Sequence, residues 1–489
     1  MKENHKSLKF NFVMNMILTI SSVIFPLITF PYITRILLPQ GTGRIAFANS
    51  IVTYFSMFAM LGIPTYGIRA CAKVRDDEER LASVVQEIWI INAAMTIFVC
   101  MVYGIAILII PAFKQEVSLM VICGSYIVLN MLGMEWLYKG LECYTYITIR
   151  SIVFKIIGII LMFLLVRKDS DYLIYAAISV FANAGYGILN FFMARKYIFR
   201  YKGKKHNYKQ HFKPVMNFFA MSVAVVIYTN LDVVMLGFLK TSADVGYYDV
   251  AVKVKVILVN IVTALGTVVL PRASYYIENN KKREFYSILN NAFELVAVIS
   301  IPLTIYFSLM AKECVILLSG NEYLEAVIPM IVIMPTIIII GFSNIIGIQI
   351  LIPIGKEHIV THSEVGGALV NLIANLVLIP RFGALGASIG TLLAEIVVLF
   401  IQFICINDMI ESIFEIVQFK KIAIAVVLST IILVYLKSFN YESYFLKLFI
   451  TSLIFFFLYG GLLIFLKEPT SITITRVLKE NYKKGKRMK

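Results

Sequence analysis

About fourteen long apolar stretches follow one another along this chain, and they constrain its fold more than any other feature. Most contain about 20 residues, which is enough for a helix to cross the hydrocarbon core of a bilayer. The polar segments between them are too short to fold alone. Hydrophobic residues make up 60% of the sequence, and the mean hydropathy is +0.83, whereas about 45–50% of a soluble globular chain is apolar. The sequence therefore predicts an all-α integral membrane protein.

The expected spans have ends placed to within about four residues. They cover residues 10–34, 45–68, 84–111, 117–138, 147–166, 172–194, 214–239, 247–270, 289–311, 326–352, 362–380, 384–406, 422–436 and 444–466. Residues 24–31 continue the first apolar stretch without a small-residue cleavage site. We therefore expect the first span to be retained rather than removed as a signal peptide.

The distribution of Lys and Arg predicts that both termini are cytoplasmic. In that orientation about 33 of the 45 basic residues lie in inner segments and about ten in outer ones, a strong positive-inside bias. The net charge of +16 is then explained mainly by topology and by contact with anionic membrane lipids. Nucleic-acid binding is not expected, because the basic clusters are dispersed beside the spans rather than gathered on one folded face.

Neither a metal nor a cofactor is expected. The six cysteines are scattered without CxxC spacing, and His358 and His362, one helical turn apart, fit a solvated surface better than a ligand pair. The segment from Gly347 to Lys356 has the wrong glycine spacing for a phosphate loop and is followed by Glu357 instead of Ser or Thr. Energy for transport would then come from an ion gradient, the membrane potential, the substrate gradient or a partner protein.

The longest basic inner segment, residues 195–213, separates the first six spans from the next six. A weak internal repeat supports this division, because Gly43, Ala48 and Arg69 recur 203 residues later (246 − 43, 251 − 48 and 272 − 69) as Gly246, Ala251 and Arg272. The predicted domains are an N-terminal six-helix lobe (1–194), a cytoplasmic basic linker (195–213), a C-terminal six-helix lobe (214–406), two additional transmembrane helices (407–466) and a basic cytoplasmic tail (467–489).

Several ordered motifs, spread from the first span to the twelfth, resemble bacterial oligosaccharide flippases of the Wzx type. They are LITFPYITRILLPQGTGRIAFANSIVTYF (27–55), GIPTYGIRACAKVRDDEER (62–80), EWLYKGLECYTYITIRSIVFK (135–155), YTNLDVVMLGFLKTSADVGYYDVAVKV (228–254), LPRAS (270–274), GFSNIIGIQILIPIGKE (341–357) and NLVLIPRFGALGASIGTLLAE (375–395). The chain departs from the family pattern at Asp249, after the Tyr pair of the GYY motif, and at Ala70, after the GIR motif.

This resemblance implies a fold related to the multidrug and toxin extrusion (MATE) transporters: two six-helix lobes around a central cavity, plus two C-terminal helices. The implied function is to flip a polyprenyl-diphosphate-linked oligosaccharide repeat unit from the inner to the outer leaflet of the bacterial plasma membrane, for O-antigen, capsule or exopolysaccharide biosynthesis. The expected partners are this lipid-linked oligosaccharide, membrane lipids, and a polysaccharide polymerase with its chain-length machinery.

Polar residues at helical spacing form one stripe in the eighth expected span. They are Asp249, Lys253, Asn260, Thr263 and Thr267. Lys255 lies about 200° further round the helix than Lys253, on the same face as Leu258, Val259 and Val262. Ionisable side chains within spans are costly unless they face protein or water. We therefore expect Lys253 to face a cavity, and Lys255 to snorkel or to pack elsewhere.

Asp232 and Lys253 should lie at similar depth if the seventh and eighth expected spans form an antiparallel hairpin. They would then form either a structural ion pair or a site in which Lys253 meets the substrate diphosphate while Asp232 tunes it. Arg35 follows Pro26 and Pro31, which permit a bend in the first span. Its guanidinium could bind phosphate through two hydrogen bonds or anchor the helix at the membrane–water interface.

Three further residues lie at the inner membrane boundary. Arg69 and Arg272 are expected to mark this boundary or to attract an anionic headgroup. Glu135, beside Trp136 and Tyr138, is expected to belong to an interfacial belt, and the alternative is a rim that binds sugar.

Two other functions remain open on the sequence alone. An ion-coupled multidrug exporter of the same fold would favour an acidic cavity for cationic drugs, whereas Lys253 and Arg35 suit an anion. A membrane polymerase or glycosyltransferase would need a sizeable outer loop with catalytic carboxylates, but the longest outer segment, 312–325, is short and partly apolar. No enzymatic activity is therefore expected.

Overall fold

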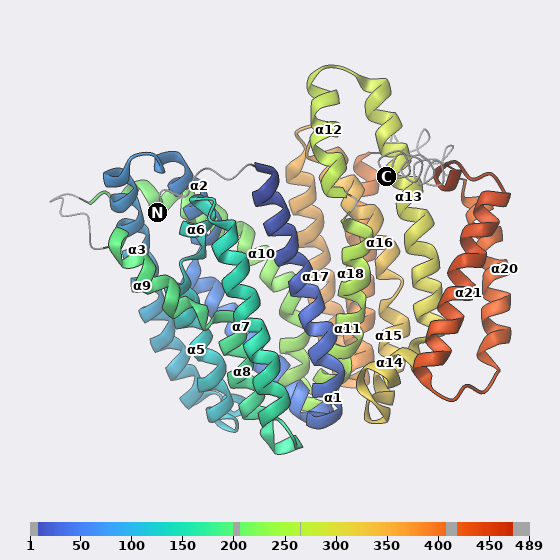
Figure 1. Cartoon of the computed structure of the whole chain (residues 1–489), viewed down its shortest axis with the longest axis horizontal. Helices are drawn as coiled ribbons and strands as arrows, with labels where there is room; N and C mark the ends of the chain where they lie inside the picture. Colours follow the sequence, from blue (N-terminus) through green and yellow to red (C-terminus); the bar gives the residue numbers. More distant parts are fainter. Residues whose placement is uncertain (1–7, 199–205, 265, 407–417, 473–489) are drawn as a thin grey trace, which may run out of the picture. The chain divides into compact units, whose positions relative to one another are not determined.

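The computed structural model describes residues 8–198, 206–264, 266–406 and 418–472, and no β-strand occurs in these ranges (Figure 1). Eleven helices among the described residues are long and apolar enough to cross a membrane, or twelve if one bent pair counts as a single span. The predicted all-α membrane fold is therefore confirmed. The expected tail from residue 473 onward and residues 199–205 of the expected linker lie outside the described ranges.

The first and eighth expected spans explain why the structure has fewer candidate membrane spans than the fourteen expected. Helix α1 (Leu8–Met60) contains the first expected span and most of the second, because it continues across a kink at Leu38, with φ 59° and ψ 175°, immediately before Pro39. The eighth expected span corresponds mainly to α11 (Ser242–Thr263), which carries four charged residues and so does not resemble a simple apolar span. These are Asp244, Asp249, Lys253 and Lys255.

Two expected spans each correspond to a pair of helices. The eighth, 247–270, comprises most of α11, which ends at Thr263, and the start of α12 (Gly266–Glu278), and residue 265 between them lies outside the described residues. The tenth expected span is a pair of segments, Asn321–Ile333 and Thr336–Leu351, bent by 42°. Pro335 lies at this bend and lacks a backbone N–H, so one helical hydrogen bond is missing there.

The chain forms two compact units, Met1–Gly246 and Tyr247–Lys489. The expected lobes, divided at residues 195–213, stay a prediction. In addition to α1, the helices of the first unit are α2 (Ile63–Val74), α3 (Glu78–Ile109), α4 (Pro111–Lys114), α5 (Val117–Gly133), α6 (Glu135–Gly140), α7 (Tyr144–Leu165), η1 (Asp169–Asp171), α8 (Tyr172–Ala184), α9 (Tyr186–Ile198) and α10 (Lys209–Leu239).

Helix α1 is central to the first unit, since it packs against α3, α5, α7 and α10. At one end of α1 the chain comes very close to itself. A Cβ atom on Gly43 would lie 1.7 Å from the carbonyl oxygen of Ser242, and one on Gly246 would lie 2.3 Å from that of Pro39. The two glycines related by the internal repeat are thus both required by close backbone packing at the same place.

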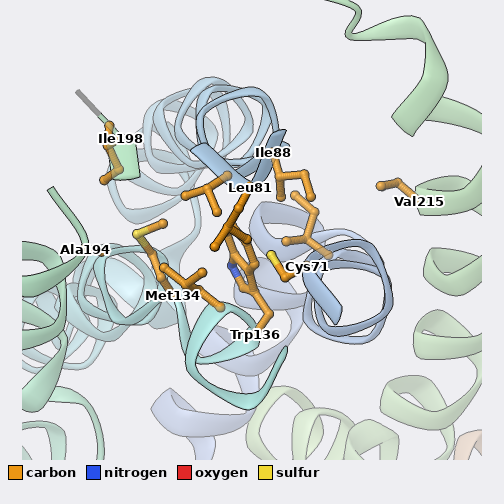
Figure 2. Packing of buried hydrophobic residues seen from close by; sticks show 11 residues of the cluster. Cys71, Leu81, Ile88, Met134, Trp136, Ala194, Ile198 and Val215 are labelled. Carbon is orange, nitrogen blue, oxygen red and sulfur yellow. The ribbon is translucent and has the colours of Figure 1, made fainter. Parts of the chain in front are cut away.

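A cluster of buried hydrophobic side chains holds α2, α3 and α6 together. Figure 2 shows the Trp136 indole among buried side chains that include Cys71, Leu81 and Met134. Gly67 makes room for this ring, because a Cβ there would lie 2.7 Å from Trp136 Cε3. Packing at this end of the unit therefore fixes the position of α6.

A buried polar cluster fastens the start of α10 to the same region. Glu87 of α3 and His211 of α10 are each 2% exposed, and His211 Nε2 lies 2.7 Å from Glu87 Oε2. The other ring nitrogen, His211 Nδ1, lies 2.6 Å from the Tyr66 hydroxyl of α2. Glu87 also accepts hydrogen bonds from the Asn207 backbone N–H at 3.0 Å and from Gln210 Nε2 at 2.9 Å. The Glu87 carboxylate thus joins α3 to α10, and the His211 ring joins α10 to α2.

The second unit contains most of α11 and the remaining helices. They are α12, α13 (Lys282–Leu309), α14 (Ala311–Ser319), η2 (Asn321–Ala326), α15 (Val327–Ile333), α16 (Thr336–Asn344), the π-helical η3 (Ile345–Leu351), α17 (Glu357–Phe382), α18 (Ala384–Cys405), α20 (Phe419–Lys437) and α21 (Tyr444–Phe465). The last two pack side by side (Figure 1). They are held to the rest of the unit by Glu313 of α14, which lies 3.2 Å from Lys447 Nζ and 3.8 Å from Lys437 Nζ.

Candidate functional site

The residues predicted from the sequence to line a cavity are divided between the two units. In the first unit Arg35 is exposed, and its Nη1 donates a hydrogen bond to the Pro31 carbonyl at 2.7 Å. Arg69 is exposed in the middle of α2, and Asp232 is buried in α10. The roles of these three residues in binding stay predictions.

In the second unit Lys253 forms an ion pair with Asp249, one turn earlier on α11, at 2.5 Å. Asn260 and Lys253 are exposed, whereas Leu258 and Val262 are buried. This arrangement agrees with a polar stripe opposite an apolar face. Arg272 is exposed on α12. The Thr267 side chain lies outside the described residues, and the expected pairing of Asp232 with Lys253 stays a prediction.

A cluster that the sequence analysis missed surrounds Arg150 in the first unit, and we call it the Arg150 site. It comprises Glu135 and Lys139 of α6, Arg150 and Lys155 of α7, and tyrosines that include Tyr138, Tyr146 and Tyr186. Met134 positions Glu135, because its left-handed backbone (φ 42°, ψ 40°) ends α5 and restarts the chain as α6.

Glu135 is shared between two cations. Its Oε1 lies 3.3 Å from Arg150 Nη2, and its Oε2 lies 3.0 Å from Lys139 Nζ. Arg150 is only 5% exposed, yet its Nε and Nη1 have no hydrogen-bond acceptor among the described residues. A buried guanidinium therefore retains unused donors, which is costly.

Tyrosine rings surround this guanidinium. The Arg150 Cζ atom lies 4.0 Å from the ring centroid of Tyr186, 5.4 Å from that of Tyr146 and 5.8 Å from that of Tyr138, in the range of cation–π attraction. Asn190 holds two of the rings: its backbone carbonyl accepts from the Tyr138 hydroxyl at 2.6 Å, and its side-chain oxygen accepts from the Tyr146 hydroxyl at 2.9 Å. The ring positions are thus fixed by contacts independent of any ligand.

Lys155 extends the positive charge along α7. It lies five residues beyond Arg150, about 7.5 Å further along the helix axis. Its Nζ donates to Ser22 Oγ at 3.0 Å and lies 3.4 Å from Ser21 Oγ, both on α1. Three cations (Lys139, Arg150 and Lys155) therefore accompany one carboxylate, and the site carries a net positive charge.

Chemically, the Arg150 site suits an anion that carries hydroxyl groups. Guanidinium and ammonium groups bind phosphate oxygens, and tyrosine rings and a carboxylate can contact a sugar. No group of His, Cys, Asp and Glu residues suited to holding a metal ion occurs in the part of the chain that the structure describes.

The sequence does contain a signal for this site. Arg150 and Lys155 lie inside the fifth expected span, 147–166, and an ionisable residue within a span is a candidate functional residue. Their link to Glu135 depends on how α6 and α7 pack, which the sequence alone does not give.

Comparison with known proteins gives consistent matches. A family model described as "Polysaccharide biosynthesis protein" matches residues 8–277. Two curated proteins named "Putative O-antigen transporter" are similar to the chain. The one from Escherichia coli K12 is 23% identical over 423 residues, 84% of this chain and 100% of that protein. The one from Shigella dysenteriae is 28% identical over 398 residues, 77% of this chain and 94% of that protein.

The fold also matches a solved structure. The lipid II flippase MurJ, in an inward closed conformation, superimposes with a TM-score of 0.74 at 17% sequence identity. The match covers 94% of this chain and 99% of that chain. At this identity the likeness concerns the fold.

Proposed function

The chain belongs to the polysaccharide biosynthesis protein family, and on that premise we propose that it is a flippase for a lipid-linked oligosaccharide. It carries a polyprenyl-diphosphate-linked repeat unit from the inner to the outer leaflet. The named relatives are transporters and a flippase whose sequences or folds match most of this chain. Their names support moving a substrate rather than altering it chemically.

The observation that carries this proposal is the positive charge inside the membrane-spanning helices of the first unit. Arg150 and Lys155 lie within α7, where an unneutralised cation is costly, and Glu135 neutralises only part of the charge. A diphosphate would complete the neutralisation. A cationic drug would instead be repelled, so the site favours the flippase over a multidrug exporter of the same fold.

We extend the proposal to the setting and to the remaining candidate residues. The protein lies in a bacterial plasma membrane with both termini cytoplasmic, and lobes 1–194 and 214–406 rock against each other in alternating access. The other residues proposed to meet substrate in the cavity are Arg35, Asp232, Lys253, Asn260, Arg69 and Arg272. A polysaccharide polymerase with its chain-length machinery uses the flipped product.

Deletion of the protein tests this function. Cells without it should lose a surface polysaccharide while lipid-linked repeat units accumulate on the cytoplasmic side of the membrane. The wild-type gene on a plasmid should restore both. Unchanged surface polysaccharide together with new sensitivity to cationic drugs would contradict the flippase proposal and support the exporter.

A further inference from the structure

We propose that Arg150 binds the diphosphate of the substrate. In the absence of substrate the Glu135 carboxylate is paired with the Arg150 guanidinium, and an entering diphosphate displaces it. This inference rests on the proposed flippase function and names the part of the substrate that the Arg150 site recognises. It also assigns Glu135 a role as an internal competitor of the substrate.

The unused donors of Arg150 are the first argument. A guanidinium has five N–H donors in a planar fork, and Glu135 is within hydrogen-bonding distance of only one nitrogen, Nη2, at 3.3 Å. The Nε and Nη1 atoms have no acceptor within the described ranges. A phosphate group can accept from two guanidinium nitrogens at once. It would therefore satisfy donors that Glu135 leaves unsatisfied.

The path of entry is the second argument. The side chains of Glu135 and Lys139 are 35% and 33% exposed, whereas Arg150 is almost completely buried. Glu135 and Lys139 thus form the accessible side of the site. A carboxylate displaced from Arg150 can remain solvated at this position, so its release does not leave a second buried charge unpaired.

The rigid surroundings of Arg150 are the third argument. Tyr186 packs against the guanidinium, and its hydroxyl also interacts with Glu135. Tyr138 and Tyr146 are held by Asn190. The contacts of Tyr138 and Tyr146 with Asn190 do not involve Glu135, so these two rings keep their positions beside Arg150 when Glu135 leaves, which limits the reorganisation that binding requires.

Charge balance supports a diphosphate in particular. Lys139, Arg150 and Lys155 carry three positive charges against the single negative charge of Glu135. The excess of two matches a diphosphate diester, with one charge on each phosphate. Lys139 lies on the accessible side of the site, where its ammonium group can reach the second phosphate.

The test is binding of two probes, farnesyl diphosphate and inorganic pyrophosphate, to the purified full-length protein in detergent, measured by isothermal titration calorimetry. Arg150→Gln should lower the affinity for both probes at least about tenfold, as expected when a charged hydrogen-bond partner is lost. The affinity of Arg150→Lys should lie between those of the wild type and Arg150→Gln, because a lysine keeps the positive charge but lacks the planar fork of N–H donors. Glu135→Gln should tighten both several-fold, because the internal competitor is removed.

Glu135→Gln separates this proposal from a purely structural role of the pair. If Arg150 and Glu135 only stabilise the fold, both single variants lose binding and thermal stability together. Arg75→Gln is the matched control, since Arg75 forms an exposed ion pair with Glu142 at 2.7 Å, and it should bind both probes as the wild type does.

Wild-type affinity in Arg150→Gln, or weaker binding in Glu135→Gln than in the wild type, would overturn the proposal. Binding of farnesyl diphosphate alone, if lost in Arg150→Gln, supports a lipid-headgroup site. Equal binding of both probes supports recognition of the diphosphate itself. The flippase function is judged separately by the deletion experiment, so either proposal can fail while the other stands.

Discussion

Replacing His211 by alanine should destabilise the first unit strongly, because it removes the closest side-chain partner of a buried carboxylate. Glu87 and His211 are both 2% exposed and lie 2.7 Å apart. Removing one member of a buried pair typically costs about 3–5 kcal/mol, since the remaining charge stays buried. The backbone N–H of Asn207 and the Gln210 amide still bind Glu87, so we expect the lower end of this range. At roughly 2–4 °C per kcal/mol for a domain of this size, the melting temperature should fall by about 6–12 °C.

Tryptophan fluorescence of the purified protein during heating can measure this change. The two tryptophans of the chain, Trp89 and Trp136, both lie in the first unit, so their signal reports on the unit that contains His211. Glu142→Gln is the control: it breaks the exposed pair with Arg75, and such pairs contribute about 0–1 kcal/mol.

A double variant tests whether the stranded charge is the cause. Adding Glu87→Gln to His211→Ala removes the unpaired carboxylate and should restore part of the lost stability. The reasoning is refuted if the melting temperature of His211→Ala lies within about 2–4 °C of that of the Glu142→Gln control, which corresponds to about 1 kcal/mol. It is also refuted if the double variant is no more stable than His211→Ala alone.

Three further predictions follow from particular contacts. Gly43→Ala should lower the yield of folded protein, because its Cβ would lie 1.7 Å from the Ser242 carbonyl oxygen. Gly104→Ala is the control: a Cβ there would have no neighbouring atom within 4 Å, and the change should stabilise the helix by about 0.5–1 kcal/mol. Equal yields of the two variants would contradict the expectation for Gly43. Lys253→Ala should abolish flipping of lipid-linked sugar in a complementation assay while Lys255→Ala is milder, and the reverse order at equal expression would show that the cavity face of α11 is assigned wrongly. Glu313→Gln should loosen the contact of α20 and α21 with the rest of the second unit, because it removes the negative charge that lies within 4 Å of Lys437 and Lys447. Hydrogen exchange should then become faster in α20 and α21 but not in α17 and α18. A uniform change across these four helices would contradict this prediction.

The sequence alone was sufficient for the helical membrane fold. The free energy of placing a segment in a bilayer depends mainly on the residues of that segment, so apolar length and charge can be evaluated one span at a time. The Asp249–Lys253 pair is also local, since residues four apart on a helix are neighbours, but the only partner expected for Lys253 from the sequence is Asp232. The family was also recognisable, because its motifs are ordered along the chain.

Only the tertiary structure brought the Arg150 site together. Arg150 lies 15 residues from Glu135 and 36 from Tyr186 (150 − 135 and 186 − 150), on three helices whose packing no local pattern gives. The left-handed backbone of Met134, a residue type that seldom has a positive φ, is likewise not given by any local pattern. Insertion into a membrane is decided within each span, whereas the partner of a buried charge is decided by which helices pack side by side. For this reason the sequence could identify Arg150 as an unusual charge but could not identify the carboxylate and the tyrosines around it.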